Sequence, residues 1–275
     1  MLPFLLLAFV ASIGAGGFGA LIGVGGGLVL VPLLTVGLGV DVHAAIAVSL
    51  LGVIAVSTTA SASYLTSGFA DRRLALRLLA ATAAGGILGG YIAGLVDGRV
   101  LSGAFGVVLA LVALQMLRTR RTQKAEVVDE PGWLEFDASY VEPTTGQDVP
   151  YRARNVGPAA VVSVGAGAIS GLLGVGGGIV NVPTMNVLMG VPIRVATTTS
   201  TYMLGATAAA SGVLYLARGD IDPILAAPIV IGMVVGARGG ARLSHRVPHR
   251  ALSLLFVLVA AFFSVQMLLR AVGPG

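Results

Sequence analysis

The sequence contains no cysteine and few charged residues. The absence of cysteine excludes disulfides, thiolate chemistry and cysteine-ligated metal sites, and it gives no sign of the redox state of the surroundings. Only 11% of the 275 residues are charged, compared with about 25% in ordinary soluble domains. A chain with so little charge is not expected to stay monomeric in water.

The residue sets needed for catalysis inside a membrane are also missing. Such chemistry requires paired carboxylates, a histidine-rich metal set or a serine–histidine dyad within apolar segments. The histidines are His43, His245 and His249, and the last two lie in a basic turn that contains Pro248. A loop explains that pair better than a metal site does. We therefore expect neither an enzyme nor a bound metal or organic cofactor.

Hydrophobic residues dominate the sequence. They make up 56% of the chain, and the mean hydropathy is +0.95. The 40 glycines lie within runs rich in Ala, Leu and Val, where small residues let membrane helices approach closely. We expect a multi-pass protein of the cell membrane, with the lipid bilayer as a partner and no nucleic-acid partner.

One ten-residue sequence motif occurs twice in the chain. It reads GVGGGLVLVP at 23–32 and GVGGGIVNVP at 174–183, with eight identical residues at an offset of 151. The same offset, without gaps, aligns Tyr64 with Tyr215 and many other residues. The chain is therefore predicted to consist of two related halves.

The boundaries of the two halves follow from a change in composition. We place the first transmembrane repeat at 1–118 and the second at 158–275, joined by a connector at 119–157. The connector holds most of the acidic residues, several prolines and Trp133, so it is expected to lie outside the membrane. A small hairpin is conceivable there, but a link that merely joins the halves is the favoured interpretation.

Six apolar runs are long enough to cross about 30 Å of hydrocarbon as helices. They are 43–66, 73–96, 100–118, 194–217, 223–241 and 251–270. A further run at 2–22 has a counterpart at 159–173 and no basic residues before it, so we interpret it as part of the fold and not as a cleaved signal. Residues 28–40 and 179–191 each follow a glycine cluster, carry a proline and span only about 20 Å as helix. The predicted fold is an all-α transmembrane bundle with a broken or re-entrant short helix in each half.

Basic residues predict the orientation in the membrane, because Lys and Arg accumulate on the cytoplasmic side. The basic residues that flank the connector are Arg118, Arg120, Arg121, Lys124, Arg152 and Arg154. With a cytoplasmic connector, counting crossings places the turns at 67–73 and 242–250 inside and those at 97–99 and 218–222 outside. Equivalent turns then face opposite sides, so the repeats are predicted to be inverted, with both termini outside.

The glycine clusters at the broken helices are candidate ligand sites. They comprise Gly25, Gly26 and Gly27 before the first short helix and Gly176, Gly177 and Gly178 before the second. Without Cβ atoms, their backbone N–H groups can approach a ligand, and helix starts attract anions. The alternative is that the glycines only permit a tight turn and close packing. Their duplication at both breaks favours a ligand role.

Hydroxyl residues follow each broken helix. They are Ser49, Ser57, Thr58, Thr59, Ser61 and Ser63 in the first half and Thr197, Thr198, Thr199, Ser200 and Thr201 in the second. Most are expected to bond carbonyls of their own helix or a neighbouring one. Ser49 and Ser200, which the repeat pairs, are the better candidates for binding an oxyanion, and Thr198 is included with them.

Other polar residues are weaker candidates. His43 and Arg194, paired by the offset, could balance an anion's charge, and His43 could also take up a proton. The alternative is that both reach the lipid headgroups. Asn181 replaces Leu30 of the first half, and Asn186 follows a turn later, so the second broken helix is predicted to contribute more to binding.

The duplicated GVGGGxVxVP, followed by AIAVSL at 45–50 or VATTTST at 195–201, resembles the sulfite exporter TauE/SafE family of TSUP permeases. The resemblance covers both halves outside the connector. It implies transport of sulfur-containing anions such as sulfite, thiosulfate and organosulfonates, or of other small organic acids. In the first copy, Ala47-Val48-Ser49 departs from the triplet expected there, whereas the second copy at 198–200 fits better.

A secondary transporter of a small anion is therefore the leading hypothesis, and a coupling proton or cation and a homodimer are both compatible with it. ATP is not expected to drive transport, because no Walker-type lysine follows a glycine loop. Gly14, Gly16 and Gly19 match a dinucleotide-binding pattern, but no strand precedes them. A passive channel or a membrane scaffold would share this composition.

Overall fold

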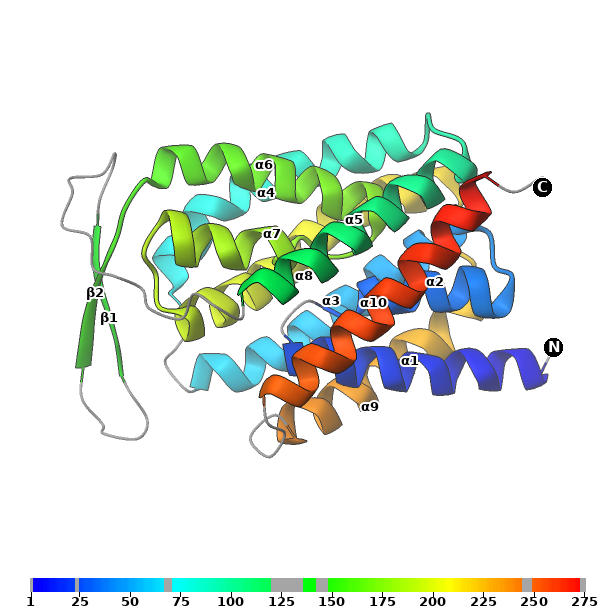
Figure 1. Cartoon of the computed structure of the whole chain (residues 1–275), viewed down its shortest axis with the longest axis horizontal. Coiled ribbons are helices and arrows are strands. Elements are labelled where there is room, and N and C mark those ends of the chain that lie inside the picture. Colours follow the sequence, from blue (N-terminus) through cyan, green and yellow to red (C-terminus); the bar gives the residue numbers. More distant parts are fainter. Residues whose placement is uncertain are drawn as a thin grey trace.

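The computed structural model describes residues 2–22, 25–66, 71–119, 136–141, 148–243 and 249–272. Trp133, Arg120, Arg121, Lys124 and His245 lie outside these ranges. Within them the chain forms an elongated bundle of helices with one small hairpin at its end (Figure 1).

The two halves contain the same elements in the same order. The first half has α1 (Leu2–Ile22), α2 (Gly27–Pro32), the π-helical turn η1 (Leu33–Gly37), α3 (Val42–Thr66), α4 (Arg72–Ala93) and α5 (Gly98–Thr119). The second half has α6 (Val156–Leu173), α7 (Gly178–Pro183), the π-helical turn η2 (Thr184–Leu188), α8 (Ile193–Arg218), α9 (Pro223–Leu243) and α10 (His249–Val272). The predicted all-α class and the short helix of each half are confirmed.

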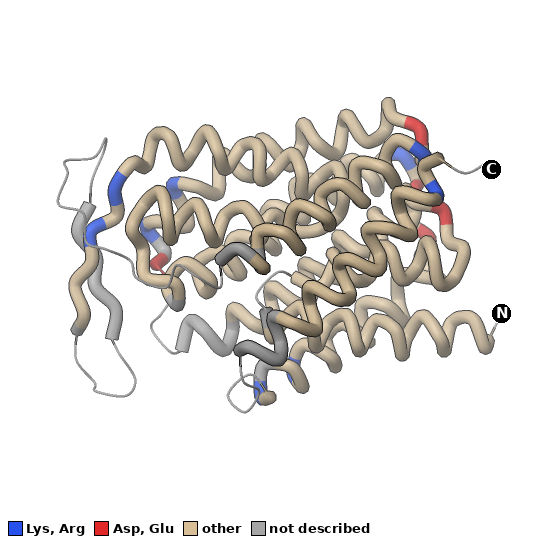
Figure 2. The backbone as a smooth tube through the Cα atoms, viewed as in Figure 1, with Lys and Arg blue, Asp and Glu red and all other residues tan. Residues whose placement is uncertain are grey.

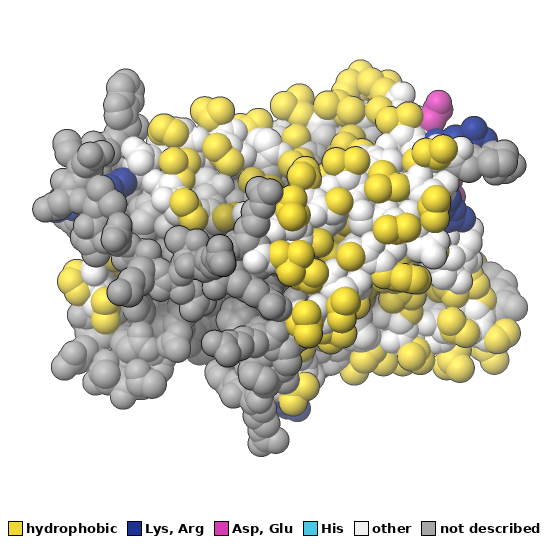
Figure 3. All heavy atoms as spheres, in the orientation of Figure 1, with side chains coloured by type: hydrophobic (Ala, Val, Ile, Leu, Met, Phe, Trp, Pro, Cys, Tyr) yellow, Lys and Arg dark blue, Asp and Glu magenta, His cyan; other side chains and the backbone are white. Residues whose placement is uncertain are grey.

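Seven of the described helices are long and apolar enough to cross a membrane. The longest helix, α8, has 26 residues but is not among them, because the run of hydroxyl residues at 197–201 lowers its hydropathy. Large hydrophobic side chains such as Leu111, Val161, Leu258 and Phe262 are exposed on the outer face, and Figure 3 shows this apolar surface over α5, α6 and α10. Such a surface suits a lipid environment.

The helices of the two halves are interleaved. α1 packs against α9, and its equivalent α6 packs against α4, while α3 packs against α8 and α5 against α10. Glycines allow these contacts: a Cβ at Gly236 would overlap the carbonyl oxygen of Ile13, and a Cβ at Gly85 would overlap that of Val164. Since Gly85 and Gly236, like Ile13 and Val164, are 151 positions apart, the same contact is made twice with the halves exchanged.

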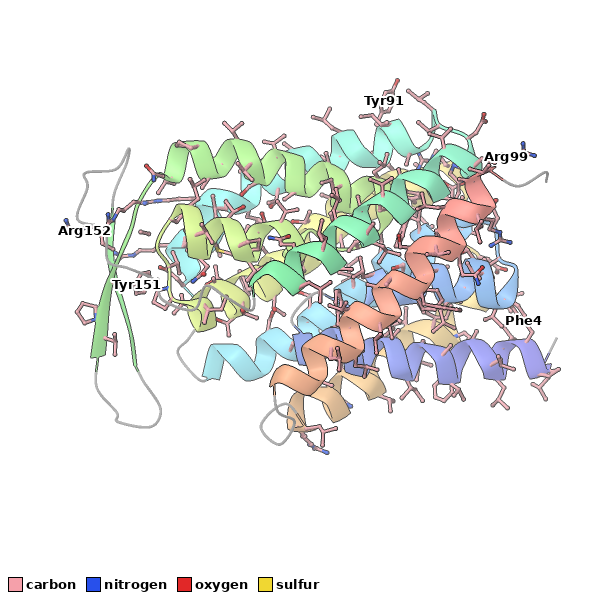
Figure 4. All side chains as sticks on the ribbon, viewed as in Figure 1. Phe4, Tyr91, Arg99, Tyr151 and Arg152 are labelled. Carbon is pink, nitrogen blue, oxygen red and sulfur yellow. The ribbon has the colours of Figure 1, made fainter. Side chains whose placement is uncertain are left out.

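Most charged residues of the described chain lie toward the two ends of the bundle, and a further basic group lies near the end of α9 (Figure 2). α1 begins and α10 ends at the end opposite the hairpin (Figure 1). The turns with Asp97 and Asp220 share that end, because Arg218 beside Asp220 donates to the Gly90 carbonyl near the end of α4. Figure 4 shows Arg99 and the exposed Tyr91 there, and Tyr151 and Arg152 at the hairpin.

The connector contains an antiparallel hairpin of β1 (Phe136–Val141) and β2 (Asp148–Ala153), paired from Phe136 with Ala153 to Val141 with Asp148. Ala153 is buried. The Arg154 N–H donates to the Met189 carbonyl at 3.0 Å, and the Asn155 amide to the Leu188 carbonyl at 3.2 Å. The connector therefore contains a hairpin that is anchored to the end of the second broken helix.

Candidate functional site

The two chain breaks have the same backbone geometry. Gly25 and Gly26 have φ angles of 83° and 78°, and Gly176 and Gly177 have φ angles of 91° and 70°. Only glycine adopts this region at little cost, which explains the clusters in the sequence. Gly26 and Gly177 immediately precede the first turn of α2 and α7.

The two breaks meet inside the bundle. A Cβ at Gly27 would overlap the carbonyl oxygen of Gly174, which ends α6 in the other half. The Ser49 hydroxyl donates to that same carbonyl at 3.0 Å, and the bond is buried. Because α2 packs on α3 and α7 on α8, this contact brings the two broken regions to one place.

The break in the first half is tightly filled. Ser49 is occupied by its bond to Gly174, and a Cβ at Gly19 would overlap the backbone nitrogen of Gly26. Leu30 is fully buried, and the space beside Gly25 is lined by Val53 and Leu204 side chains. Next to this break, no buried side-chain hydroxyl or amide of the described residues lacks a partner; the unpaired Ser61 hydroxyl lies further along α3.

The break in the second half contains buried polar atoms without partners. Five buried side-chain oxygens of the described residues make no hydrogen bond, and three of them lie on the elements around this break: the Ser170 hydroxyl, the Asn181 Oδ1 atom and the Ser200 hydroxyl; the other two are the Ser61 and Ser163 hydroxyls. Each such atom costs about 1–3 kcal/mol of folding free energy. Sequence reasoning selected Asn181 and Ser200 but missed Ser170, although its alignment with Gly19 was a signal that could have found it.

Most of the other hydroxyls bond their own helix, as expected. Thr58, Thr59, Thr197 and Thr201 donate to the carbonyls four residues earlier, and the Thr198 hydroxyl donates to Val195 at 3.1 Å. These bonds hold the threonine hydroxyls against the backbone of their own helices.

Ser57 makes a different kind of contact. Its hydroxyl donates to the Thr201 carbonyl at 2.6 Å and accepts the Gly205 N–H at 2.9 Å. In an α-helix those two backbone groups bond each other, so the serine of α3 inserts into the backbone ladder of α8. Such insertions are a recognised cause of helix kinks.

Two of the weaker candidates, His43 and Asn186, contact backbone carbonyls of the surrounding fold. The His43 Nε2 atom is 3.2 Å from the Ala93 carbonyl oxygen and 3.1 Å from that of Val96, at the end of the bundle. The Asn186 amide donates to the Val191 carbonyl at 2.9 Å and holds the loop after η2. Arg194 occupies the second position of α8, and its side chain lies outside the described atoms.

One cation that sequence reasoning missed contacts a broken helix. The Arg270 guanidinium of α10 donates to the Thr35 carbonyl in η1. The Thr35 hydroxyl in turn donates to the Val31 carbonyl at 2.9 Å. Arg270 also lines a surface depression of about 280 Å³ together with Val36, Gln266 and Leu269.

A second chain of contacts links the hairpin to α8. The Tyr151 hydroxyl donates to the Asp71 carboxylate at 2.5 Å. Asp71 also accepts the N–H groups of Arg73 and Leu74 at the start of α4, and its own N–H donates to the Thr199 hydroxyl at 3.1 Å. Burial and the Asp71 carboxylate raise the pKa of Tyr151 above its ordinary value.

An apolar helical bundle in which matching chain breaks of two repeats meet is the architecture of a membrane transporter. The chain belongs to the sulfite exporter TauE/SafE family, whose model matches residues 8–267. It is 26% identical to the probable membrane transporter protein YunE of Bacillus subtilis (strain 168), over 98% of this chain and 99% of that protein.

Other relatives have similar names. A probable membrane transporter protein of Xylella fastidiosa (strain 9a5c) is 27% identical over 93% of this chain and 94% of its own length. The probable membrane transporter protein YdhB of Bacillus subtilis (strain 168) is 22% identical over 98% of both chains. No solved structure shows a significant match.

Proposed function

We propose that this chain is a secondary transporter of a small anion, a sulfur oxyanion or an organosulfonate, which binds where the two chain breaks meet. The observation that carries the proposal is the buried junction of Gly27, Gly174 and Ser49, which joins the glycine-led breaks of both halves. The family description, which names sulfite, supports the sulfur-containing substrate.

The chemistry around the breaks suits an anion. The first N–H groups of a helix have no acceptor within the helix, and glycines let a ligand approach them. The sequence has no acidic residue from 42 to 66 or from 174 to 219, so no carboxylate on α3, α7 or α8 would repel a negative charge. The buried hydroxyls of Ser170 and Ser200 add donors.

Inverted repeats would give this site access to both sides of the membrane in turn. In Figure 1, α1 starts at the end opposite the hairpin and runs toward the hairpin end. Its equivalent α6 starts beside the hairpin and runs in the opposite direction. The hairpin end carries Arg73, Arg77, Arg152 and Arg154, which supports a cytoplasmic connector and termini outside. We further propose that a proton or cation gradient drives transport and that the chain acts as a homodimer.

Uptake by proteoliposomes that contain the full chain tests the function. Radiolabelled or fluorimetric uptake of sulfite, thiosulfate, sulfoacetate and taurine should reveal at least one substrate with saturable flux. Ser200→Ala should reduce that flux, whereas Thr58→Ala, which removes an exposed hydroxyl from α3, should not. Flux that never saturates would indicate a channel, and the absence of flux for all four compounds would refute the proposal.

A further inference from the structure

The two halves differ in the polarity of equivalent positions around their breaks. Ser170, Asn181 and Ser200 align with Gly19, Leu30 and Ser49. Their exposed fractions are 0%, 2% and 0%, yet each carries an oxygen without a hydrogen-bond partner among the described residues. In the first half the same positions hold no side chain, an apolar side chain and a satisfied hydroxyl.

Two of the three residues lie beside Gly177, at the start of one short helix. The Ser170 Cβ lies 3.4 Å from where a Cβ of Gly177 would be, and the Asn181 N–H donates to the Gly177 carbonyl at 3.1 Å. Ser170 and Asn181 therefore both lie next to Gly177. The helices that carry them, α6 and α7, are in contact.

The repeat predicts that Ser200 faces the same short helix. In the first half, Leu30 lies 3.7 Å from where a Cβ of Gly52 would be, so the residue at this position of the short helix faces the following long helix. The equivalent pair is Asn181 and Met203. Ser200 precedes Met203 by three residues and therefore shares its face of α8, toward α7.

The kinds of unpaired atom limit the ligand. A serine hydroxyl donates one hydrogen bond and also accepts, so Ser170 and Ser200 can bind anionic oxygens. The Asn181 Oδ1 atom only accepts, so an anion without a hydrogen would leave it unpaired. A small anion whose oxygens accept from the two serines, and whose O–H or N–H group donates to Asn181, would satisfy all three.

We infer that the substrate site is confined to the second half, around Ser170, Asn181 and Ser200, and that it selects small anions that carry a hydroxyl or amino group. This inference rests on the proposed function and narrows its substrate class. The first half supplies the packing that positions the site, through Ser49 and Gly27 against Gly174.

Two sulfonates that differ by one hydroxyl test the selectivity. Isethionate and ethanesulfonate are compared as substrates and competitors in proteoliposomes of the full chain. The wild-type protein should prefer isethionate by about tenfold or more, because the analogue leaves a buried acceptor unpaired. Asn181→Leu, which installs the residue of the first half, should remove the preference.

A stability measurement separates a binding role from a structural one. Because Asn181→Leu removes an unpaired buried oxygen, it should raise the melting temperature in detergent while it abolishes the preference. Ser170→Gly and Ser200→Ala should weaken the binding of both sulfonates about equally. Thr58→Ala, at an exposed position of α3, should leave the preference unchanged.

The outcomes distinguish this inference from the proposed function. Saturable flux with equal use of the two sulfonates, or a preference that survives Asn181→Leu, would overturn the inference and leave transport intact. If Asn181→Leu does not fold, Ser170→Gly and Ser200→Ala provide the test. Unchanged affinity for both sulfonates in these two variants would also overturn the inference. Absence of saturable flux for any sulfur anion would instead refute the proposed function.

Discussion

Two serines at equivalent positions of the repeats have different surroundings. Ser49 donates to the Gly174 carbonyl, whereas Ser200 has no partner among the described residues. A hydroxyl that completes a buried hydrogen bond adds to stability, but one left unpaired subtracts from it. At the residue scale, the duplicated sequence has thus kept one serine in the scaffold and left the other without a partner among the described residues.

This contrast predicts opposite effects of the same substitution. Ser49→Ala leaves the Gly174 carbonyl without its donor and should lower the free energy of unfolding by about 1–3 kcal/mol. Ser200→Ala should leave it unchanged or raise it. Thermal unfolding of the purified variants in detergent measures both, and a larger loss for Ser200→Ala would contradict the assignment.

Gly27 should tolerate no side chain. Gly27→Ala places a methyl group against the Gly174 carbonyl and should destabilise the protein by about 1–3 kcal/mol. Gly165 in α6 has nothing within 4 Å of its Cβ position, so Gly165→Ala should be neutral or stabilising by about 0.5–1 kcal/mol. Equal melting temperatures for the two variants would show that the breaks do not touch as described.

At the scale of elements, the hairpin is connected to α8 through the start of α4. The path runs from Tyr151 through Asp71 to Thr199, the residue before Ser200. Since these contacts join the connector to the helix that borders the proposed site, a change in the hairpin can alter the position of that helix.

Tyr151→Phe should uncouple the hairpin. The loss of a hydrogen bond to a carboxylate should lower stability by about 1.5–3 kcal/mol, and proteolysis within the connector should become faster. The raised pKa of Tyr151 means that its contribution is fully present below the pKa of the unfolded residue and is lost only as the pH rises through the higher folded value. Tyr91→Phe, on an exposed site of α4, is the matched control and should change neither property.

The sequence predicted most elements because apolar length and glycine breaks are local signals. The run at 43–66 became α3 at Val42–Thr66, and the break before residue 28 became the start of α2 at Gly27. Hydrophobic runs carry no information on their partners, so the packing of α1 on α9 was not predicted. Ser170 was missed for a similar reason: it is distant in sequence from the hydroxyl runs, and only the fold brings it beside Gly177.

At the scale of the whole molecule, the proposed orientation can be tested directly because the chain contains no cysteine. Single cysteines at Pro150 in β2 and at Arg99 at the start of α5, both exposed positions, lie at opposite ends of the bundle. A membrane-impermeant maleimide should label Arg99→Cys in intact cells, and Pro150→Cys only after the membrane is opened. Labelling of Pro150→Cys in intact cells would show that the orientation is the opposite of the one proposed.

The exchange of partners between the halves has a consequence for biosynthesis. α1 leaves the ribosome well before α9, the helix that covers its glycine-rich face, because the connector and most of the second half lie between them. Until α9 has been made, the glycine-rich face of α1 is therefore exposed to lipid or to insertion factors. A chain that stops after the connector would leave both α1 and α4 without their partners, and it should be cleared by quality-control proteases instead of accumulating as a half-sized bundle.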